Sequence, residues 1–209
     1  MQLIGMLDSP YVRRVAISLQ LLGLPFEHRS MSLFRQFDEF GRINPVVKAP
    51  TLVCDDASLL MESSLIIDYA EALAAPRTLM PAALADRLRT LQLTGLALVA
   101  CEKSVQIVYK RKLRPADKQH APWLERVQGQ LAAALAAIEL ALATRPLACT
   151  SASIDQAGVS CAVAWKFVRE LQPELADPAL HPALHAHSER AEQLPAFARA
   201  PHGEGTVGR

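Results

Sequence analysis

Apolar and polar positions follow two different periodicities over the first eighty residues, and this pattern predicts alternating strands and helices. Short apolar runs of strand length cover residues 2–6, 25–31, 49–54 and 58–61, and helical periodicity covers residues 10–22, 35–43 and 63–75. The first helix has the clearest ends, because Ser9 is a natural N-cap, Pro10 suits the first turn and Gly23 suits the residue after the last turn. The order β-α-β-α-β-β-α predicts a small α/β layer ending in a hairpin. In the helix after this hairpin, four residues are expected on the buried side: Leu65, Ile66, Tyr69 and Leu73.

Beyond Pro81 the pattern is helical throughout. Helices are expected at residues 84–112, 121–144, 153–171, 181–192 and 195–200, followed by a frayed tail from residue 201. Ser153 and Gln156 have the spacing of a capping box, which predicts that Ser153 caps the third of these helices. We therefore expect an α/β domain at residues 1–77, a linker at 78–85 and an all-helical domain at 86–209.

Composition and charge narrow the classes of function. The chain has 209 residues, 51% of them hydrophobic, and a formal net charge of +1. A near-neutral chain argues against generic nucleic-acid binding, which depends on basic charge. No uninterrupted apolar run approaches the ~20 residues of a membrane span, and the N-terminus has no signal-type pattern. The four cysteines are far apart without zinc-ligand spacing. We expect a cytoplasmic protein with no metal, membrane or nucleic-acid partner.

Three short segments of the α/β domain carry groups that can bind a ligand. Ser9 precedes the first helix, whose N-terminal N–H groups and positive dipole favour an anion or a thiolate. Ala49–Pro50 stands at the start of a strand, where a cis bond would turn the Ala49 backbone toward a ligand. Glu62 and Ser63 begin another helix, where they could hold the ammonium and carboxylate of an α-amino acid. Taken singly, each segment also fits an ordinary helix cap or loop.

Taken together, the segments resemble the glutathione transferase superfamily, and most of all its small bacterial serine-type members. The likeness rests on Ser9-Pro10-Tyr11 with Arg13, on Lys48-Ala49-Pro50-Thr51-Leu52, and on Glu62-Ser63 leading into Ile66 and Tyr69. The capping box at residues 153–156 extends it over nearly the whole length, although many members have Asp where Gln156 stands. The resemblance implies a thioredoxin-like N-terminal domain followed by the all-helical domain of this superfamily.

The resemblance also implies that glutathione binds to the α/β domain as a co-substrate, without a metal. Ser9 would donate a hydrogen bond to the sulfur, and Glu62 with Ser63 would hold the γ-glutamyl end. Ala49, beside a cis Pro50, would bind the cysteinyl unit through its backbone. The first strand carries no tyrosine and position 9 no cysteine, which argues against the tyrosine-type and cysteine-type chemistries.

Further roles follow from the same resemblance. Lys48, or alternatively Arg35, would meet the glycyl carboxylate of glutathione. Tyr11, Tyr109 and Trp165 would border the pocket for the second substrate, with core or surface packing as the alternative for each. Tyr11 or a backbone amide is also an alternative to the serine as the group that activates the thiol.

The implied activity is conjugation of the glutathione thiolate to a small apolar electrophile by a homodimeric transferase. In that dimer the helix after the hairpin of one subunit would face the long helices of the other. Two alternatives stay open: a non-catalytic interaction protein of the same fold, such as the stringent starvation proteins, and a glutathione-dependent reductase or peroxidase. Retention of Glu62 and Ser63 favours a ligand-binding protein over a pure interaction module.

Overall fold

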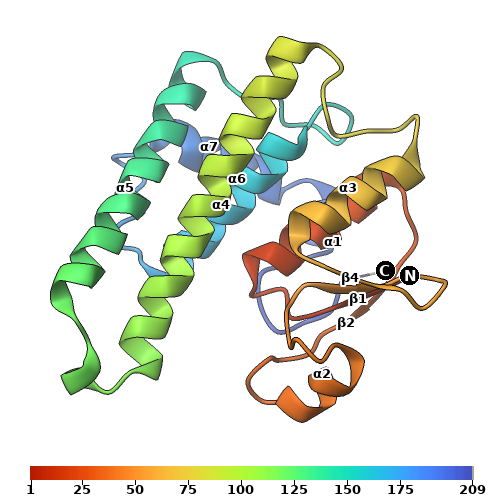
Figure 1. Ribbon diagram of the computed structural model, residues 1–209. Helices are drawn as coiled ribbons and strands as arrows, with labels where there is room; N and C mark the ends of the chain where they lie inside the picture. The colour runs from red at the N-terminus through yellow and green to blue at the C-terminus, as the bar shows by residue number, and fades with distance from the viewer. Residues whose placement is uncertain (209) are drawn as a thin grey trace. The chain divides into compact units, whose positions relative to one another are not determined.

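Residues 1–208 are described by a computed structural model, and they divide into two units (Figure 1). Unit 1 comprises Met1–Met80 together with the C-terminal segment from Gln193 onward, and unit 2 comprises Pro81–Glu192. The predicted thioredoxin-like layer and the helical domain are both confirmed. The division after Met80 lies within the expected linker at residues 78–85. The segment after Glu192, which was expected in the helical domain, belongs to unit 1 instead.

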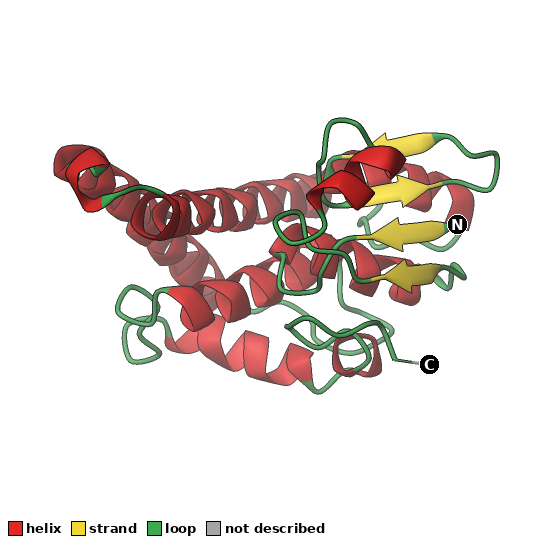
Figure 2. Cartoon of the chain, turned by 90° about the horizontal axis from the view of Figure 1, so that it is seen from below, coloured by secondary structure: helices red, strands yellow, loops and turns green. Residues whose placement is uncertain are grey.

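Unit 1 is built on a four-stranded mixed sheet in the order β2-β1-β3-β4 (Figure 2). The central strand β1 runs parallel to β2 and antiparallel to β3, which pairs antiparallel with β4. Helices α1 and α3 pack together on one face of the sheet, and α2 lies on the other (Figures 1 and 2). The elements of this unit are β1 (Gln2–Ile4), α1 (Pro10–Leu22), β2 (Glu27–Arg29), α2 (Phe37–Ile43), β3 (Thr51–Val53), β4 (Leu59–Met61), α3 (Ser63–Ala74) and α8 (Pro195–Ala198).

Successive residues of a strand contribute to the two opposite faces of the sheet. Leu3 and Ile4 of β1 are both fully buried and point to opposite faces, since side chains alternate along a strand. Ile4 packs with Met31 and with Phe40 of α2. The ends of α1 are as predicted: Ser9 is the N-cap and Gly23 adopts the left-handed conformation at the C-terminus.

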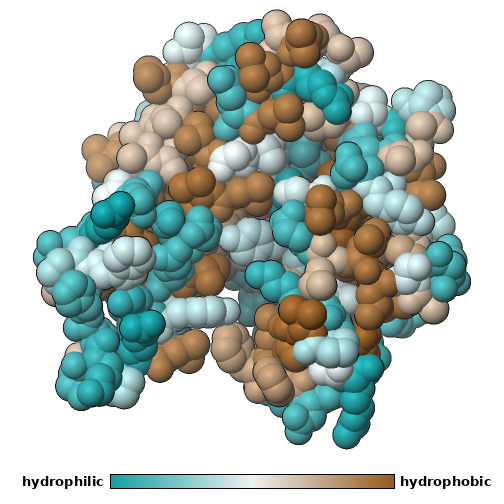
Figure 3. Space-filling view, in the orientation of Figure 1, coloured by the Kyte–Doolittle hydropathy of each residue, from teal (hydrophilic) through white to brown (hydrophobic). Residues whose placement is uncertain are grey.

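The buried side of α3 differs from the prediction. Ile66, Ile67 and Ala70 are buried, whereas Leu65, Tyr69 and Leu73 are exposed. Only Ile66 of the four expected residues lies in the core. The apolar residues of this helix cover more than one side, so the periodicity alone did not distinguish the side that packs on α1. Figure 3 shows apolar surface in the region of α3 and β4.

Unit 2 is helical in all its described elements, with α6 at its centre. Helix α6 packs against both α4 and α7, and α5 packs against α4 and α7. Residues 156–165 of α6 are all buried. By length and composition alone, α4 and α5 each could cross a membrane, and about a third of the relevant stretch in each is buried within the protein. The elements are α4 (Leu84–Leu113), the 3₁₀ turn η1 (Ala116–Lys118), α5 (Ala121–Thr144), α6 (Gln156–Leu171) and α7 (Pro182–Glu192).

The expected capping box at the start of α6 is wrong. The N-cap is Asp155, whose carboxylate accepts a hydrogen bond from the Gly158 N–H at 2.8 Å. Ser153 lies outside the helix and its hydroxyl pairs with Thr150 Oγ1. Gln156 is the first helical residue and its side-chain amide donates to Ser160. Asp155, two residues after Ser153, is the cap instead, and its second carboxylate oxygen is held by a tertiary hydrogen bond from Thr90 Oγ1.

Candidate functional site

The register of the sheet brings the three ligand-binding segments to one end of unit 1. Ile4, the last residue of β1, pairs with Thr51, the first of β3, and Thr51 pairs with Met61, the last of β4. The β1–α1 loop, the Ala49–Pro50 turn and the start of α3 therefore leave the same end of the sheet. A ligand held there would meet all three segments.

Ser9 stands where the β1–α1 loop enters the helix. Its Oγ accepts a hydrogen bond from the Val12 N–H at 3.4 Å. A hydroxyl can accept and donate at once, so this bond leaves the Ser9 proton able to point at a ligand atom. The loop lies close to the Ala49 turn because Gly5 has no side chain. A Cβ at Gly5 would lie 2.6 Å from Val12 Cγ2 and 3.1 Å from Ala49 Cβ, and its φ of +136° also favours glycine.

The Ala49–Pro50 peptide bond is cis, as expected. Side chains on either side of it hold the turn: buried Asn44 donates to Thr51 Oγ1 at 2.8 Å, and Thr51 Oγ1 donates to the Lys48 carbonyl at 2.6 Å. Within the described residues, the Ala49 main chain takes no part in the hydrogen bonds of this turn. Its N–H and C=O can therefore pair with an extended ligand segment.

Glu62 and Ser63 form the third part of the site. Glu62 is the N-cap of α3, its Oε2 accepts from the Ser64 N–H at 3.0 Å, and Ser63 Oγ donates to Glu62 Oε1 at 3.2 Å. The backbone of Glu62 has φ +73°, a region that a residue with a side chain adopts only when its surroundings hold it there. The carboxylate is exposed at a helix N-terminus, where both an ammonium and a carboxylate of one ligand can be paired.

Sequence reasoning missed Arg14, which lies behind this helix start. Its side chain is buried, and Nη1 donates to Ser63 Oγ at 3.0 Å and to Ser64 Oγ at 3.2 Å. A buried guanidinium next to the N-terminus of α3 adds positive charge where a ligand carboxylate would bind. The available signal was a charged residue directly preceding Val15 in the apolar pattern of α1, since a buried charge needs partners.

Known proteins share this fold. The profile of the glutathione S-transferase N-terminal domain family matches residues 3–78. The crystal structure of a glutathione S-transferase from Methylobacterium radiotolerans, in complex with glutathione sulfonate, superposes with a TM-score of 0.88 at 27% identity, covering 100% of this chain and 98% of that one. Residues 3–78 thus match a glutathione S-transferase N-terminal domain, and the whole chain has the glutathione transferase fold.

Two further proteins extend the comparison. A glutathione transferase family member from Pseudomonas fluorescens Pf-5, with bound glutathione, gives a TM-score of 0.80 at 26% identity over 97% of this chain and 98% of that one. The Uncharacterized GST-like protein YibF of Escherichia coli K12 is 25% identical over 83% of this chain and 85% of its own length.

The two cations expected to meet the glycyl carboxylate of glutathione, Lys48 and Arg35, have different surroundings in this structure. Lys48 is exposed beside the cis turn. Arg35 forms an ion pair with Glu204 at 2.8 Å, and its Nη2 lies 3.8 Å from Met6 Sδ, two residues after β1. Lys48 is therefore open to a ligand carboxylate, whereas Arg35 is already paired with the carboxylate of Glu204.

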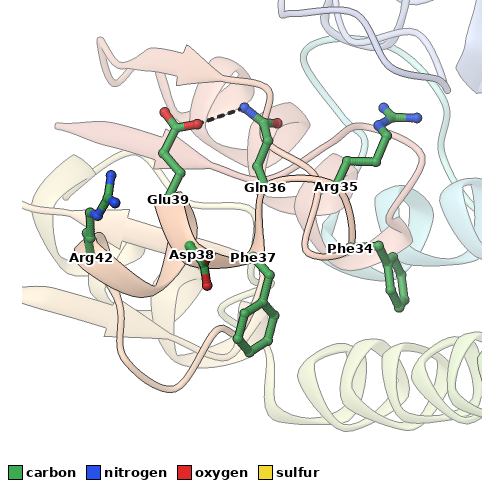
Figure 4. Close-up of a pocket in the computed structure, with 7 residues that line it drawn as sticks. All are labelled: Phe34, Arg35, Gln36, Phe37, Asp38, Glu39 and Arg42. Atoms are coloured by element: carbon green, nitrogen blue, oxygen red, sulfur yellow. Dashed lines mark hydrogen bonds between the residues drawn. The ribbon is translucent and has the colours of Figure 1, made fainter.

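Arg35 belongs to a shallow hollow along the segment that leads into α2 (Figure 4). Phe34 and Phe37 are among its lining residues and are both largely exposed. Gln36 donates to Glu39 Oε2 at 3.0 Å across it. The hollow is open and polar, and it contains none of the backbone or hydroxyl groups of the three segments above, so the site at the end of the sheet remains the better candidate.

The aromatic residues expected around a second substrate have separate positions. Tyr11 is half-buried on α1 in unit 1, and Tyr109 is 43% exposed on α4 in unit 2. Trp165 is only 1% exposed, and its indole N–H donates to His185 Nδ1 at 3.3 Å. Its ring also packs against His181. For Trp165 the structure favours the alternative, core packing, because the ring is part of the core of unit 2.

Proposed function

We propose that this protein binds glutathione at the end of the unit 1 sheet and conjugates the thiolate to a small apolar electrophile. The observation that supports the proposal is the sheet register, in which the loop that carries Ser9, the Ala49–Pro50 turn and the Glu62–Ser63 helix start all leave the same end of the sheet. Solved relatives that hold glutathione or glutathione sulfonate support the choice of ligand.

Each part of glutathione has a chemically matched partner. The γ-glutamyl ammonium pairs with the Glu62 carboxylate, and its carboxylate accepts from Ser63 and the first amides of α3. The cysteinyl N–H and C=O pair with the main chain of Ala49. The glycyl carboxylate meets Lys48, with Arg35 as the alternative cation. This arrangement points the cysteinyl sulfur toward the N-terminus of α1.

Ser9 supplies the activation of the thiol in this proposal. A thiol of pKa ~8.5 is only about 3% ionised at pH 7, and lowering its pKa to about 6.5 requires roughly 2.7 kcal/mol of preferential thiolate stabilisation. A hydrogen bond to a charged group contributes ~1.5–3 kcal/mol and a helix N-terminus ~0.3–1 kcal/mol. The thiolate then attacks the electrophilic carbon, a C–S bond forms, and the leaving group departs with its electron pair.

The sequence at the site favours conjugation over redox chemistry. A glutathione-dependent reductase needs a cysteine to form a mixed disulfide at the helix start, and this chain has Ser9 there. Cys54 is buried beside the hairpin, where burial raises the pKa of its thiol. A raised thiol pKa disfavours the thiolate that such chemistry needs.

The test of activation is the pKa of bound glutathione, read from thiolate absorbance in the ultraviolet. Ser9→Ala should raise that pKa by one to two units, while affinity for S-methylglutathione, which has no thiol proton, stays within about twofold. Ser58→Ala, a serine variant in the β3–β4 turn at the opposite end of the sheet, is the matched control. An unchanged bound-thiol pKa in Ser9→Ala would reduce Ser9 to a helix cap and leave Tyr11 or a backbone amide as the activating group.

Binding and conjugation are separated by a second measurement. Wild-type protein should be retained on immobilised glutathione, be eluted by the free tripeptide, and accelerate conjugation of 1-chloro-2,4-dinitrobenzene or a related electrophile. Retention without acceleration across a panel of electrophiles would favour a non-catalytic binding protein, and absence of retention would contradict the proposed site.

A further inference from the structure

The segment after α8 lies against unit 1 instead of fraying as the sequence suggested. Ser30, one residue beyond β2, donates its hydroxyl to the Glu204 carbonyl at 2.7 Å. The Val207 N–H donates to His28 Nδ1 at 3.1 Å. These two bonds fix the tail (residues 201–208) along the edge strand of the sheet.

His28 connects this tail to the candidate site. Because its Nδ1 accepts from Val207, the ring proton is on Nε2, which donates to the Gly5 carbonyl at 2.8 Å. Gly5 begins the loop that carries Ser9. The His28 side chain thus links the tail to the loop backbone that positions the Ser9 hydroxyl.

Glu204, in the tail, forms an ion pair with Arg35 near the end of the sheet where the candidate site lies. Its Oε1 lies 2.8 Å from Arg35 Nη1, and both side chains are more than 60% exposed. Arg35 also reaches Met6 in the β1–α1 loop. Asp8, next to Ser9, is within electrostatic reach of Arg35, Glu204 and His202, and desolvation raises the pKa of its carboxyl. The tail thus adds a negative charge where the site would otherwise present an unpaired guanidinium to an anionic ligand.

We propose that the tail is an autoinhibitory strap in which the Glu204 carboxylate competes with the glycyl carboxylate of glutathione for Arg35. The inference rests on the proposed glutathione site. An exposed ion pair is weak enough to exchange with another carboxylate, and a guanidinium offers the same planar donors to either one. Glutathione binding with Arg35 engaged requires the Glu204 side chain to release, so the strap lowers affinity without blocking the other contacts.

The experiment compares two ligands that differ only at the contested group. Glu204→Gln should bind glutathione about two- to fivefold more tightly than wild type in calorimetry, and its affinity for glutathione glycyl monoethyl ester should be unchanged. Glu174→Gln is the matched control, because Glu174 forms an exposed pair of similar geometry with Arg111 in unit 2, at 3.0 Å, and its loss changes net charge equally.

A double-mutant cycle separates competition from long-range repulsion of the anionic tripeptide. In an Arg35→Gln background, Glu204→Gln should give no further gain, whereas a gain that persists would overturn the strap. Equal glutathione affinity in wild type and Glu204→Gln would also overturn it and leave the proposed function intact. Tighter binding of glutathione, but not of its glycyl ester, by Glu204→Gln would support the strap, and no binding by any variant would contradict both proposals.

Discussion

Glu62 shows how much of the candidate site depends on single residues. Its backbone is held at a positive φ, its carboxylate caps α3 through Ser64, and the same carboxylate is the proposed partner of the glutathione ammonium. Removing it costs the protein a cap and the ligand an ion pair, and these two losses can be measured separately. The buried Arg14 holds Ser63 and Ser64 in place from behind.

Replacing Glu62 by Ala should weaken glutathione binding about tenfold, since a charge-assisted hydrogen bond contributes roughly 1.5 kcal/mol at an exposed position. Asp68→Ala is the matched control, because Asp68 is an exposed carboxylate on the same helix, away from its start. Calorimetry of both variants with glutathione checks this. Equal affinities for the two variants would remove Glu62 from the site.

His187 predicts how stability depends on pH. Its Nε2 donates to the Gly158 carbonyl at 3.0 Å, and its Nδ1 is buried without a hydrogen-bond partner. Burial lowers the pKa of this imidazole below its usual 6.5. The unfolded chain therefore takes up a proton first, so stability should fall as the pH drops through 6.5 toward the lowered folded pKa.

Urea unfolding at pH 7.5 and 5.5 tests this dependence. The wild-type midpoint should be lower at pH 5.5, and His187→Gln should show a smaller difference between the two pH values. Part of the dependence should remain in the variant, because burial also lowers the pKa of His28. A midpoint that rises on acidification would contradict the assignment.

At the scale of elements, the residue that caps α6 also determines where this helix packs. Asp155 caps it through Gly158, and its second carboxylate oxygen accepts from Thr90 Oγ1 of α4 at 2.8 Å. One carboxylate thus fixes both the start of the central helix of unit 2 and its position against α4. Glu139 of α5 plays a similar part for α7, accepting from the N–H groups of Ala183 and Leu184.

Asp155→Ala should destabilise the protein by about 2–3 kcal/mol, the combined loss of a helix cap and of a hydrogen bond to a charged group. Ser153→Ala, which removes only a surface hydroxyl pair, should cost less than about 0.5 kcal/mol. Chemical denaturation of the two variants provides the comparison. A larger effect at Ser153 than at Asp155 would restore the capping box predicted from the sequence.

At the scale of the whole molecule, each unit leaves apolar side chains uncovered. Leu59, Met61, Leu65, Tyr69 and Leu73 are exposed on β4 and α3 of unit 1. Helix α4 of unit 2 exposes Leu84, Leu88, Leu91 and Val99. Exposed apolar side chains gathered on one element are a feature of interaction surfaces. We propose that these faces form a two-fold homodimer interface.

Sedimentation at micromolar concentration should therefore give a species of about twice 22.8 kDa. Leu65→Glu should shift it toward monomer, because a charge would be buried at the interface, while leaving the melting temperature of the monomer nearly unchanged at this exposed position. Asp68→Ala, on the same helix, tests whether any α3 substitution has this effect. A wild-type species of only ~23 kDa would overturn the dimer.

Local chemistry determined the features of this protein that could be predicted from its sequence. Ser9, Pro10 and Gly23 set the ends of α1 because caps depend on residues a few positions apart, and the cis bond at Pro50 is a property of one dipeptide in its turn. The order of strands and helices along the chain followed from short-range periodicity in the same way. The three segments of the site could be identified because each is a short motif at the end of an element.

The tertiary structure alone decided where residues distant in sequence meet. Arg14 became part of the site through α3, and Asp155 became the α6 cap partly through Thr90 of α4. The tail belongs to unit 1 because Arg13 Nε donates to the Ala200 carbonyl at 2.8 Å and His28 accepts from Val207. These partners are between 49 and 187 residues apart in sequence, where neither propensity nor periodicity reaches, because both are properties of neighbouring residues.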